Sequence, residues 1–170
     1  MHRPRYVLLL TAILTSFIAG CVGREARADD DEARDALAVA TAELPCDQRP
    51  YSILLTVRNV KNDMGTITVD LHGDDPERWK KKGGKLARLR YPATAGETKA
   101  CIPVDGPGRY ALAVYHDRDG DGKFDKTWIG LPDEPYGLSN DAPVRLGNPR
   151  YDEVSFEVAG PNAAVFTTLN

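Results

Sequence analysis

From residue 46 onward, apolar and polar residues alternate in seven short segments that are separated by turn-forming residues. The segments are centred on Leu55, Val69, Leu89, Ile102, Leu112, Phe156 and Thr167. Alternation with a period of two is typical of a strand that buries one face and exposes the other. Seven such strands predict an all-β domain over residues 46–170, folded as a seven-stranded antiparallel β-sandwich.

The composition is that of a folded, acidic protein. Hydrophobic residues make up 42% of the sequence and charged residues 28%, which excludes a chain that is disordered throughout. The formal net charge of -3 excludes a generally basic nucleic-acid binder, so we expect no nucleic acid among the partners.

The first residues have the features of an export signal. Two arginines precede an apolar run over residues 6–18, which is too short to cross a bilayer and has the length of a signal-peptide core. The run is followed by a cysteine, and the sequence Ile-Ala-Gly-Cys that ends at Cys21 resembles the lipobox of bacterial lipoproteins. This resemblance implies a signal peptide over residues 1–20 and lipidation of Cys21. An ordinary secretory signal, cleaved after Ala28, is the alternative.

Residues 21–45 are predicted to form a lipidated, flexible tether. The segment is rich in Ala, Arg, Asp and Glu and has almost no large apolar side chain that could order its backbone. In lipoproteins of this kind an Asp after the modified cysteine usually means retention in the inner membrane, and here Val22 takes that place. The expected location is therefore the bacterial cell envelope, at the outer membrane, with the domain facing the periplasm.

Two cysteines remain once Cys21 is assigned to the lipid. Cys46 and Cys101 lack the C-x-x-C spacing of redox and metal sites, and no histidine is close to either in the sequence. An even number of cysteines in an exported protein is typical of disulfide pairing, so the sequence predicts a structural Cys46–Cys101 disulfide.

An acidic segment, DRDGDGKFD, follows the strand that ends at His116. Its spacing is that of a calcium loop of the EF-hand kind, in which alternate side chains converge on one ion and a glycine, here Gly122, makes the sharp turn. The predicted ligands are the side chains of Asp117, Asp119, Asp121 and Asp125 and the carbonyl of Lys123. Because all of these ligands are oxygens, calcium is the expected cofactor.

The calcium pattern lacks its bidentate glutamate, because Trp128 occupies that position. Glu134, Asn140 and Asp141 in the following segment are the candidates to replace it. The expected affinity is therefore weak, with a dissociation constant of roughly 10⁻⁴ to 10⁻³ M. A turn closed by Asp side chains without any metal is the alternative.

The long connection over residues 130–152 shows little alternation, and long loops inside compact domains are often functional. It supplies most of a candidate binding loop for an envelope protein or a glycan, formed by His116, Glu134, Tyr136, Ser139, Asn140 and Asp141. The expected function is a non-enzymatic binding or structural module. A carbohydrate-active or other hydrolase that uses His116 with nearby carboxylates is the alternative.

A second irregular connection, residues 73–84, carries Trp79 and several lysines. Such a basic segment could contact anionic lipid headgroups. A solvated, lysine-rich edge with Trp79 covering the core is the favoured interpretation.

Three segments carry a family resemblance. They are LLTVRNVKNDMGTITVDL (54–71), PGRYALAVYHDRDGDGKFD (107–125) and GLPDEPYGLSND (130–141). Together they resemble an uncharacterised family of exported bacterial domains, domain of unknown function 2141, over about residues 50–170. The resemblance implies a β-sandwich of the transthyretin, Cna-B or immunoglobulin-like kind and implies no enzymatic activity.

Overall fold

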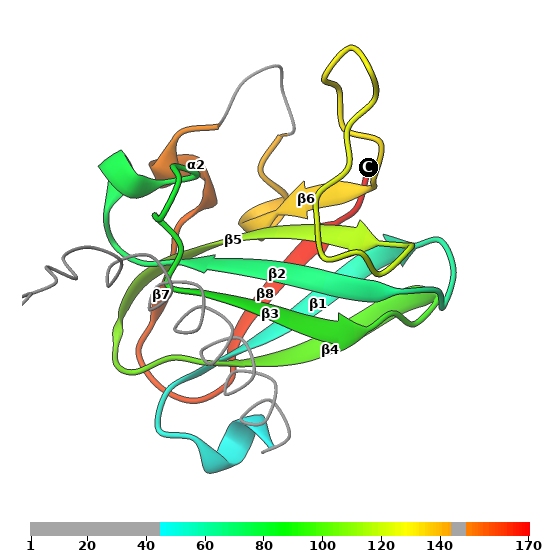
Figure 1. Cartoon of the computed structure of the whole chain (residues 1–170). Coiled ribbons are helices and arrows are strands. Elements are labelled where there is room, and N and C mark those ends of the chain that lie inside the picture. The colour runs from blue at the N-terminus through cyan, green and yellow to red at the C-terminus, as the bar shows by residue number, and fades with distance from the viewer. Residues whose placement is uncertain (1–44, 144–148) are drawn as a thin grey trace, which may run out of the picture.

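The computed structural model describes residues 45–143 and 149–170, which form a mostly β structure (Figure 1). The strands are β1 (Ser52–Val60), β2 (Thr66–His72), β3 (Ala87–Pro92), β4 (Gly96–Pro103), β5 (Gly108–Asp117), β6 (Tyr136–Leu138), β7 (Phe156–Val158) and β8 (Ala163–Thr168). The helical elements are one α-helical turn, α2 (Tyr151–Val154), and the 3-10 turns η1 (Cys46–Gln48), η2 (Pro76–Arg78) and η3 (Ser139–Asp141). The predicted signal peptide, Cys21 and the tether up to residue 44 lie outside the described residues.

The strands form two sheets. One has the order β4-β1-β8, and the other has the order β3-β2-β5-β6, with β7 also paired to β5. All pairs are antiparallel except β1 and β8, which run parallel with Leu55 opposite Val165. The expectation of a wholly antiparallel fold was therefore wrong for this pair, and β6 is an additional strand within the long connection. The alternation of residues shows which face of a strand is buried, but it does not encode the direction of the neighbouring strand.

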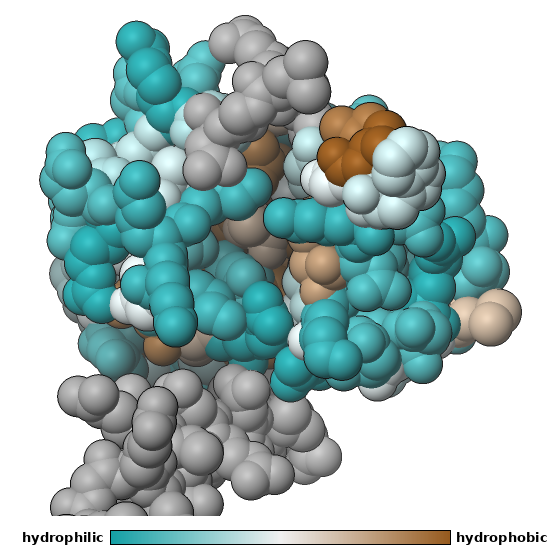
Figure 2. Space-filling model, turned by 45° about the horizontal axis from the view of Figure 1, so that its top comes forward, coloured by the Kyte–Doolittle hydropathy of each residue, from teal (hydrophilic) through white to brown (hydrophobic). Residues whose placement is uncertain are grey.

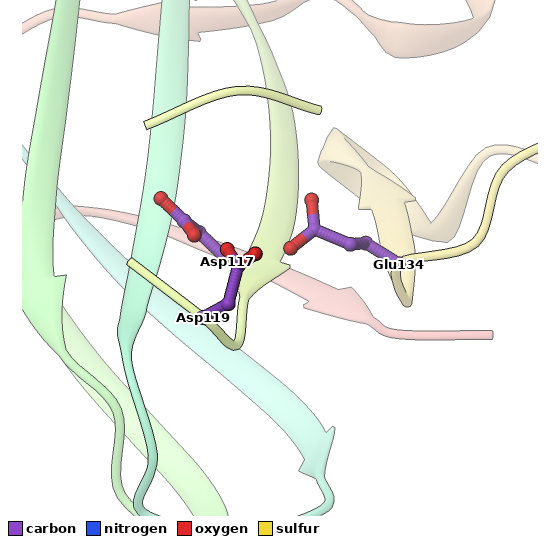
Figure 3. Close-up of side chains that lie close together, drawn as sticks. All are labelled: Asp117, Asp119 and Glu134. Carbon is purple, nitrogen blue, oxygen red and sulfur yellow. The ribbon is translucent and has the colours of Figure 1, made fainter. Parts of the chain in front are cut away.

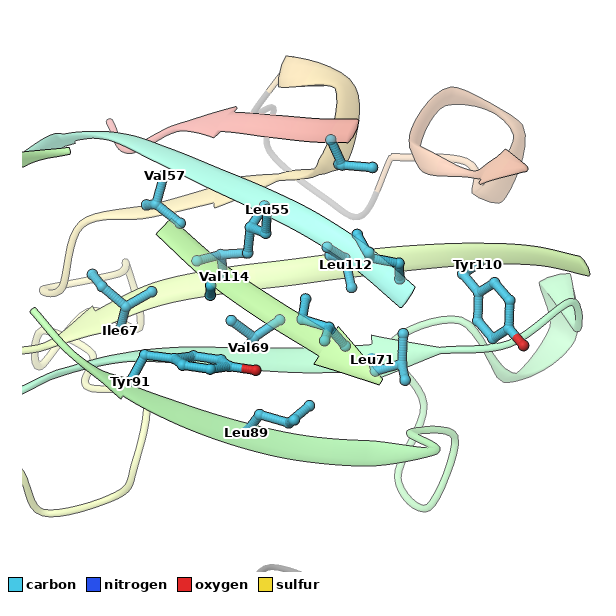
Figure 4. Packing of buried hydrophobic residues seen from close by; sticks show 14 of the residues in the cluster. Leu55, Val57, Ile67, Val69, Leu71, Leu89, Tyr91, Tyr110, Leu112 and Val114 are labelled. Carbon is cyan, nitrogen blue, oxygen red and sulfur yellow. The ribbon is translucent and has the colours of Figure 1, made fainter. Parts of the chain in front are cut away.

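The predicted inward-facing residues form a shared core between the two sheets. Figure 4 shows side chains of β1 facing those of β2, β3 and β5. The buried strand residues of this core are Ile53, Leu55, Val57, Val60, Ile67, Val69, Leu71, Leu89, Tyr91, Ala100, Ile102, Tyr110, Leu112, Val114, Val158 and Val165. Burial of such side chains stabilises the fold by about 1.5–3 kcal/mol each before the entropic cost of folding is counted. Val154, predicted as a strand residue, instead ends the helical turn α2.

Trp79 anchors a second cluster on the outer face of the larger sheet. Its indole Nε1 donates a hydrogen bond to the carbonyl of Pro149 at 2.9 Å, and its ring meets His72 edge-on with centroids 4.7 Å apart. Burial lowers the pKa of His72, although the charge of Asp70 opposes this effect. The favoured role of Trp79, covering buried residues beneath a lysine-rich segment, agrees with this packing.

The predicted disulfide between Cys46 and Cys101 is present, with the two Cα atoms 5.4 Å apart. It joins η1, directly before β1, to β4, the strand paired with β1. The carbonyl of Cys101 also accepts a hydrogen bond from the buried hydroxyl of Tyr91 at 2.6 Å. The disulfide therefore fixes the start of the described chain to the smaller sheet. Within residues 45–143 and 149–170, no helix has the length and apolar character needed to cross a membrane.

Candidate functional site

The pairing of β5 with β6 brings Glu134 to the acidic loop. Tyr115 lies opposite Tyr136 in this antiparallel pair, and the backbone amide of His116 donates to the carbonyl of Pro135 at 2.9 Å. Continuing the register by two residues beyond the Tyr115–Tyr136 pair places Glu134 opposite Asp117. The pairing of β5 with β6 thus brings a glutamate that is distant in sequence near the first position of the acidic loop.

Three carboxylates converge at this point. Asp117, Asp119 and Glu134 each offer an oxygen, and these oxygens lie within 4.8 Å of one another (Figure 3). Asp117 and Glu134 are buried, whereas Asp119 is exposed at the rim. The site therefore has two fixed acids at its base and one accessible acid above them.

Backbone amides hold the two buried carboxylates in place. Asp117 accepts hydrogen bonds from the amides of Gly120 at 2.8 Å and Gly122 at 3.0 Å, which wraps the loop around its side chain. Glu134 accepts from the amide of Arg118 at 3.1 Å and from that of Asp125 at 3.2 Å, near the two ends of the loop. These four hydrogen bonds fix the positions of the two buried carboxylates relative to the backbone of the loop.

Burial and repulsion between neighbouring acids raise the pKa of two carboxyl groups at this site, those of Glu134 and Asp125. Burial raises the pKa of Glu134, and the charges of Asp117 and Asp125 add to the effect, while its two backbone hydrogen bonds oppose it. Burial also raises the pKa of Asp125, with further contributions from the acids around it, beginning with Asp121 and Asp119. A bound cation would relieve this repulsion, because it favours the charged form of every acid that it contacts.

The remaining predicted ligands are oriented differently. Asp121 accepts hydrogen bonds from the amide of Lys123 at 2.7 Å and from its ammonium at 3.1 Å, and it does not belong to the converging group. The backbone hydrogen bond from Lys123 is the main cause that lowers the pKa of Asp121. Asp125 is also outside the converging group and lines the neighbouring depression. Gly122 has the left-handed conformation predicted for the sharp turn, with φ 77°.

A shallow depression of about 390 Å³ adjoins the carboxylates. It is lined by Asn62, Met64, Arg118, Asp119, Asp125, Asp133 and Glu134. The guanidinium of Arg118 is directed to the carbonyl of Asp133 at 3.0 Å rather than to the three converging acids. Four of the seven lining residues are acidic, and Met64 adds apolar surface.

Phe124 anchors the acidic loop to the sheet, a role that the sequence did not reveal. Its ring packs edge-on against Tyr115 and Tyr136, with centroid distances of 5.2 and 5.5 Å. Arg88, which pairs with Asp70, donates to the carbonyl of Gly122 at 3.3 Å on the same face. The only signal in the sequence is one aromatic residue within an otherwise polar segment.

The candidate binding loop is divided by the structure. Glu134 and Tyr136 belong to the acidic site, whereas Ser139, Asn140 and Asp141 stabilise the fold elsewhere. The hydroxyl of Ser139 is buried and accepts from the amide of Leu112 at 2.9 Å. The amide group of Asn140 donates to the carbonyl of Ser155 at 3.0 Å, and Asp141 accepts from the backbone amide of Thr168. Asn140 and Asp141 therefore do not provide the missing ligand of the acidic loop.

His116 lies in the interior, contrary to its predicted place in a binding loop. It is 0% exposed, and its Nε2 is 2.7 Å from the carbonyl oxygen of Met64. His72, the other histidine among the described residues, is buried as well. Neither imidazole is therefore exposed at the surface of the described part of the chain.

A comparison with protein families identifies the chain. The model of an uncharacterized protein family conserved in bacteria, DUF2141, matches residues 55–165. The chain belongs to this family. The match to DUF2141 runs from β1 to β8 and includes the acidic loop and Glu134, as the resemblance in the sequence predicted. No match was found among curated proteins or among solved structures.

Proposed function

We propose that this DUF2141 protein is a lipid-anchored, non-enzymatic module of the bacterial cell envelope whose acidic loop is stabilised by calcium. The observation that carries the calcium part is the convergence of Asp117, Asp119 and Glu134 within 4.8 Å. The lipid anchor is supported by the lipobox-like sequence that ends at Cys21. On this proposal the domain faces the periplasm from the outer membrane.

The donor set favours calcium for a geometric reason. Oxygen atoms that share one calcium ion lie about 2.3–2.6 Å from it, so they lie no more than about 5 Å from one another. The three converging oxygens meet this condition. All are hard carboxylate ligands, which disfavours softer metals that prefer sulfur or nitrogen. Because Asp121 is engaged by Lys123, the affinity is expected to stay in the range of roughly 10⁻⁴ to 10⁻³ M typical of extracellular modules.

The two packed sheets support assignment to β-sandwiches of the transthyretin, Cna-B or immunoglobulin-like kind. Such domains commonly present loops at one end of rigid sheets for binding. Here the acidic loop and the depression of about 390 Å³ beside it form one such end. The proposed partner is an envelope protein or a glycan that donates hydrogen bonds to this acidic surface. The formal net charge of -3 disfavours nucleic acid.

Calcium titration of the purified protein by calorimetry tests the metal site. We expect binding with the weak affinity given above, and a loss of at least about tenfold in affinity for either Asp119→Asn or Glu134→Gln, because each removes one charged ligand. Both substitutions keep the size of the side chain. Asp119 is exposed, so the fold should persist in Asp119→Asn, which is the decisive variant. Glu134→Gln also replaces one acceptor of a backbone hydrogen bond by an NH₂ group, so its thermal unfolding is compared with that of the unmodified protein.

Asp121→Asn serves as the matched control for this titration. It removes one charge from the same loop but leaves the three converging carboxylates unchanged. We expect its affinity to stay within about threefold of the unmodified protein, since only long-range electrostatics change. Equal affinities for all variants, or no binding heat in any of them, would show that the loop closes without calcium.

Fatty-acid labelling in bacteria tests the anchor. The unmodified protein should incorporate labelled fatty acid and sediment with membranes, whereas Cys21→Ser should lose the label, because the thiol that accepts the lipid is gone. A secreted protein that carries no label and starts at residue 29 would instead support the ordinary secretory signal.

A further inference from the structure

The chain between the acidic loop and β6 forms a small closed hairpin, residues 126–132. Lys126 and Pro132 form an antiparallel bridge at its base. The amide of Thr127 donates to the carbonyl of Leu131 at 2.8 Å, and the amide of Gly130 donates to the carbonyl of Thr127 at 2.8 Å. The hydroxyl of Thr127 also accepts from the amide of Leu131. These bonds close the turn on itself, so its side chains are presented by a defined backbone.

Three large apolar side chains project from this hairpin. Trp128 is 96% exposed, Ile129 is 58% exposed and Leu131 is 45% exposed. The other tryptophan, Trp79, is only 5% exposed. Figure 2 shows the strongest brown colour of this face on a projection at the place where Figure 1 has the loop before β6. Exposed apolar side chains that are adjacent and rigidly held are typical of an interaction surface.

The shape and chemistry of the tip fit a lipid layer. The tip projects, and neither of the two depressions described along residues 45–143 and 149–170 is lined by its three apolar side chains. A fluid interface closes around such a projection, whereas a glycan or a peptide needs directed polar groups as well. Tryptophan in particular favours the level of the lipid headgroups, where its ring is apolar and its N–H stays hydrated.

Charged groups lie at the base of the hairpin. Lys126 stands at the bridge that closes the hairpin. Burial is the main cause that lowers the pKa of Lys80, and the charge of Lys126 contributes in the same direction. The exposed side chains of Lys81 and Lys82 belong to the same basic segment as Lys80, which follows Trp79 in the sequence. A lysine near an anionic membrane surface is attracted to it. The base of the hairpin thus carries Lys126 beside the acids Asp125 and Asp133, whose backbones are joined by a hydrogen bond of 3.0 Å. The attraction to a bilayer therefore comes mainly from the apolar side chains of the tip.

We propose that the hairpin 126–132 is a membrane-docking element, in which Trp128, Ile129 and Leu131 enter the headgroup region of a bilayer. The docking needs neither the lipid on Cys21 nor calcium, so it can fail or succeed independently of the proposed function. A cation in the acidic loop strengthens docking to anionic lipids, because it reduces repulsion between the loop carboxylates and the headgroups.

Tryptophan fluorescence tests the docking directly. The probes are vesicles of mixed phosphatidylethanolamine and phosphatidylglycerol, with or without brominated acyl chains, added to residues 21–170, which lack the predicted signal peptide, with Cys21→Ser. We expect a blue shift of the emission and quenching by bromine, because Trp128 is exposed to water in the free protein and enters the lipid on binding. The same chain with Trp128→Phe retains only the buried Trp79 and should show neither change.

A second variant separates insertion from a general effect on the fold. Ile129→Ser combined with Leu131→Ser keeps Trp128 as the reporter and should weaken co-sedimentation with vesicles at least about tenfold. The vesicle titration is repeated with calcium and with a chelator, which shows whether loss of vesicle binding comes from the calcium site. Repeating it with the lipidated protein shows whether the lipid anchor contributes to binding. Unchanged emission of Trp128 on all vesicles would overturn the proposal. A shift that appears with envelope proteins or glycans but not with bare vesicles would also overturn it and assign the tip to such a partner.

Discussion

Replacing Gly65 with alanine is expected to lower the free energy of unfolding by about 3 kcal/mol or more. Gly65 closes the turn between β1 and β2 with φ 67°. A Cβ atom at this position would lie 1.9 Å from the carbonyl oxygen of Asp117 and 2.8 Å from that of Arg118. Both contacts are to backbone, which cannot move without displacing the end of β5 and the start of the acidic loop. The substitution is therefore also expected to weaken calcium binding by displacing Asp117.

Gly96→Ala is the matched control for this effect. Gly96 also has a left-handed conformation, with φ 85°, but a Cβ there would meet no atom within 4 Å. Its replacement should cost only the conformational strain, about 1–2 kcal/mol, and leave calcium affinity unchanged. Urea denaturation of both variants, monitored through the buried Trp79, gives the comparison. Equal losses of stability would show that the close approach of the turn to the acidic loop contributes nothing beyond the strain of the turn.

The close approach of Gly65 to the end of β5 is one feature of the fold that the sequence does not reveal. The Asn-Asp-Met-Gly segment predicts a turn before β2, but it does not indicate that the turn packs on the end of β5. The same limit applies to β6, because Tyr-Gly-Leu is too short for alternation to be recognised. At Gly137 a Cβ would lie 2.4 Å from the hydroxyl oxygen of Thr167, so glycine allows β6, the edge strand of the larger sheet, to lie close to β8 of the smaller sheet.

The sequence indicated some of the residues that converge at the candidate site but not all of their orientations. The aspartate spacing identified Asp117 and Asp119, and the missing ligand directed attention to Glu134, which the register of β5 and β6 then places nearby. Asp121 has the correct spacing but faces the ammonium of Lys123, two residues away. Spacing defines which positions can converge, whereas the competition of a neighbouring lysine for one carboxylate depends on side-chain conformations that spacing does not specify.

The buried position of His116 follows from the alternation of inward and outward residues, provided that β5 is extended to its last residue, Asp117. Tyr110, Leu112 and Val114 face the core, and a strand that continues to Asp117 puts His116 on the same face. The carbonyl of Met64 then satisfies its Nε2. A histidine beside an acidic loop invites a catalytic interpretation, but the period of two assigns its side chain to the interior and that of Asp117 to the opposite face.

Replacing both Cys46 and Cys101 with alanine is expected to remove about 4 kcal/mol of stability. The disulfide joins residues 55 positions apart, and restricting a loop of this length in the unfolded chain has about that effect. The enclosed segment contains β1, β2, β3 and most of β4, so strands of both sheets are affected. Chemical reduction of the unmodified protein should produce the same loss. Urea denaturation of the oxidised, reduced and doubly substituted forms measures it.

The two forms without the disulfide distinguish the entropic effect from a local one. If the bond acts on the unfolded chain, reduction and double substitution should agree within about 1 kcal/mol, and calcium affinity should be unchanged, because the acidic loop lies outside the enclosed segment. A much larger loss on substitution than on reduction would show instead that packing around Cys101, where Tyr91 donates its hydroxyl hydrogen bond, provides the stability. A loss below about 1 kcal/mol in both forms would contradict the prediction, because the contacts between β1 and β4 would then hold the described start of the chain without the covalent link.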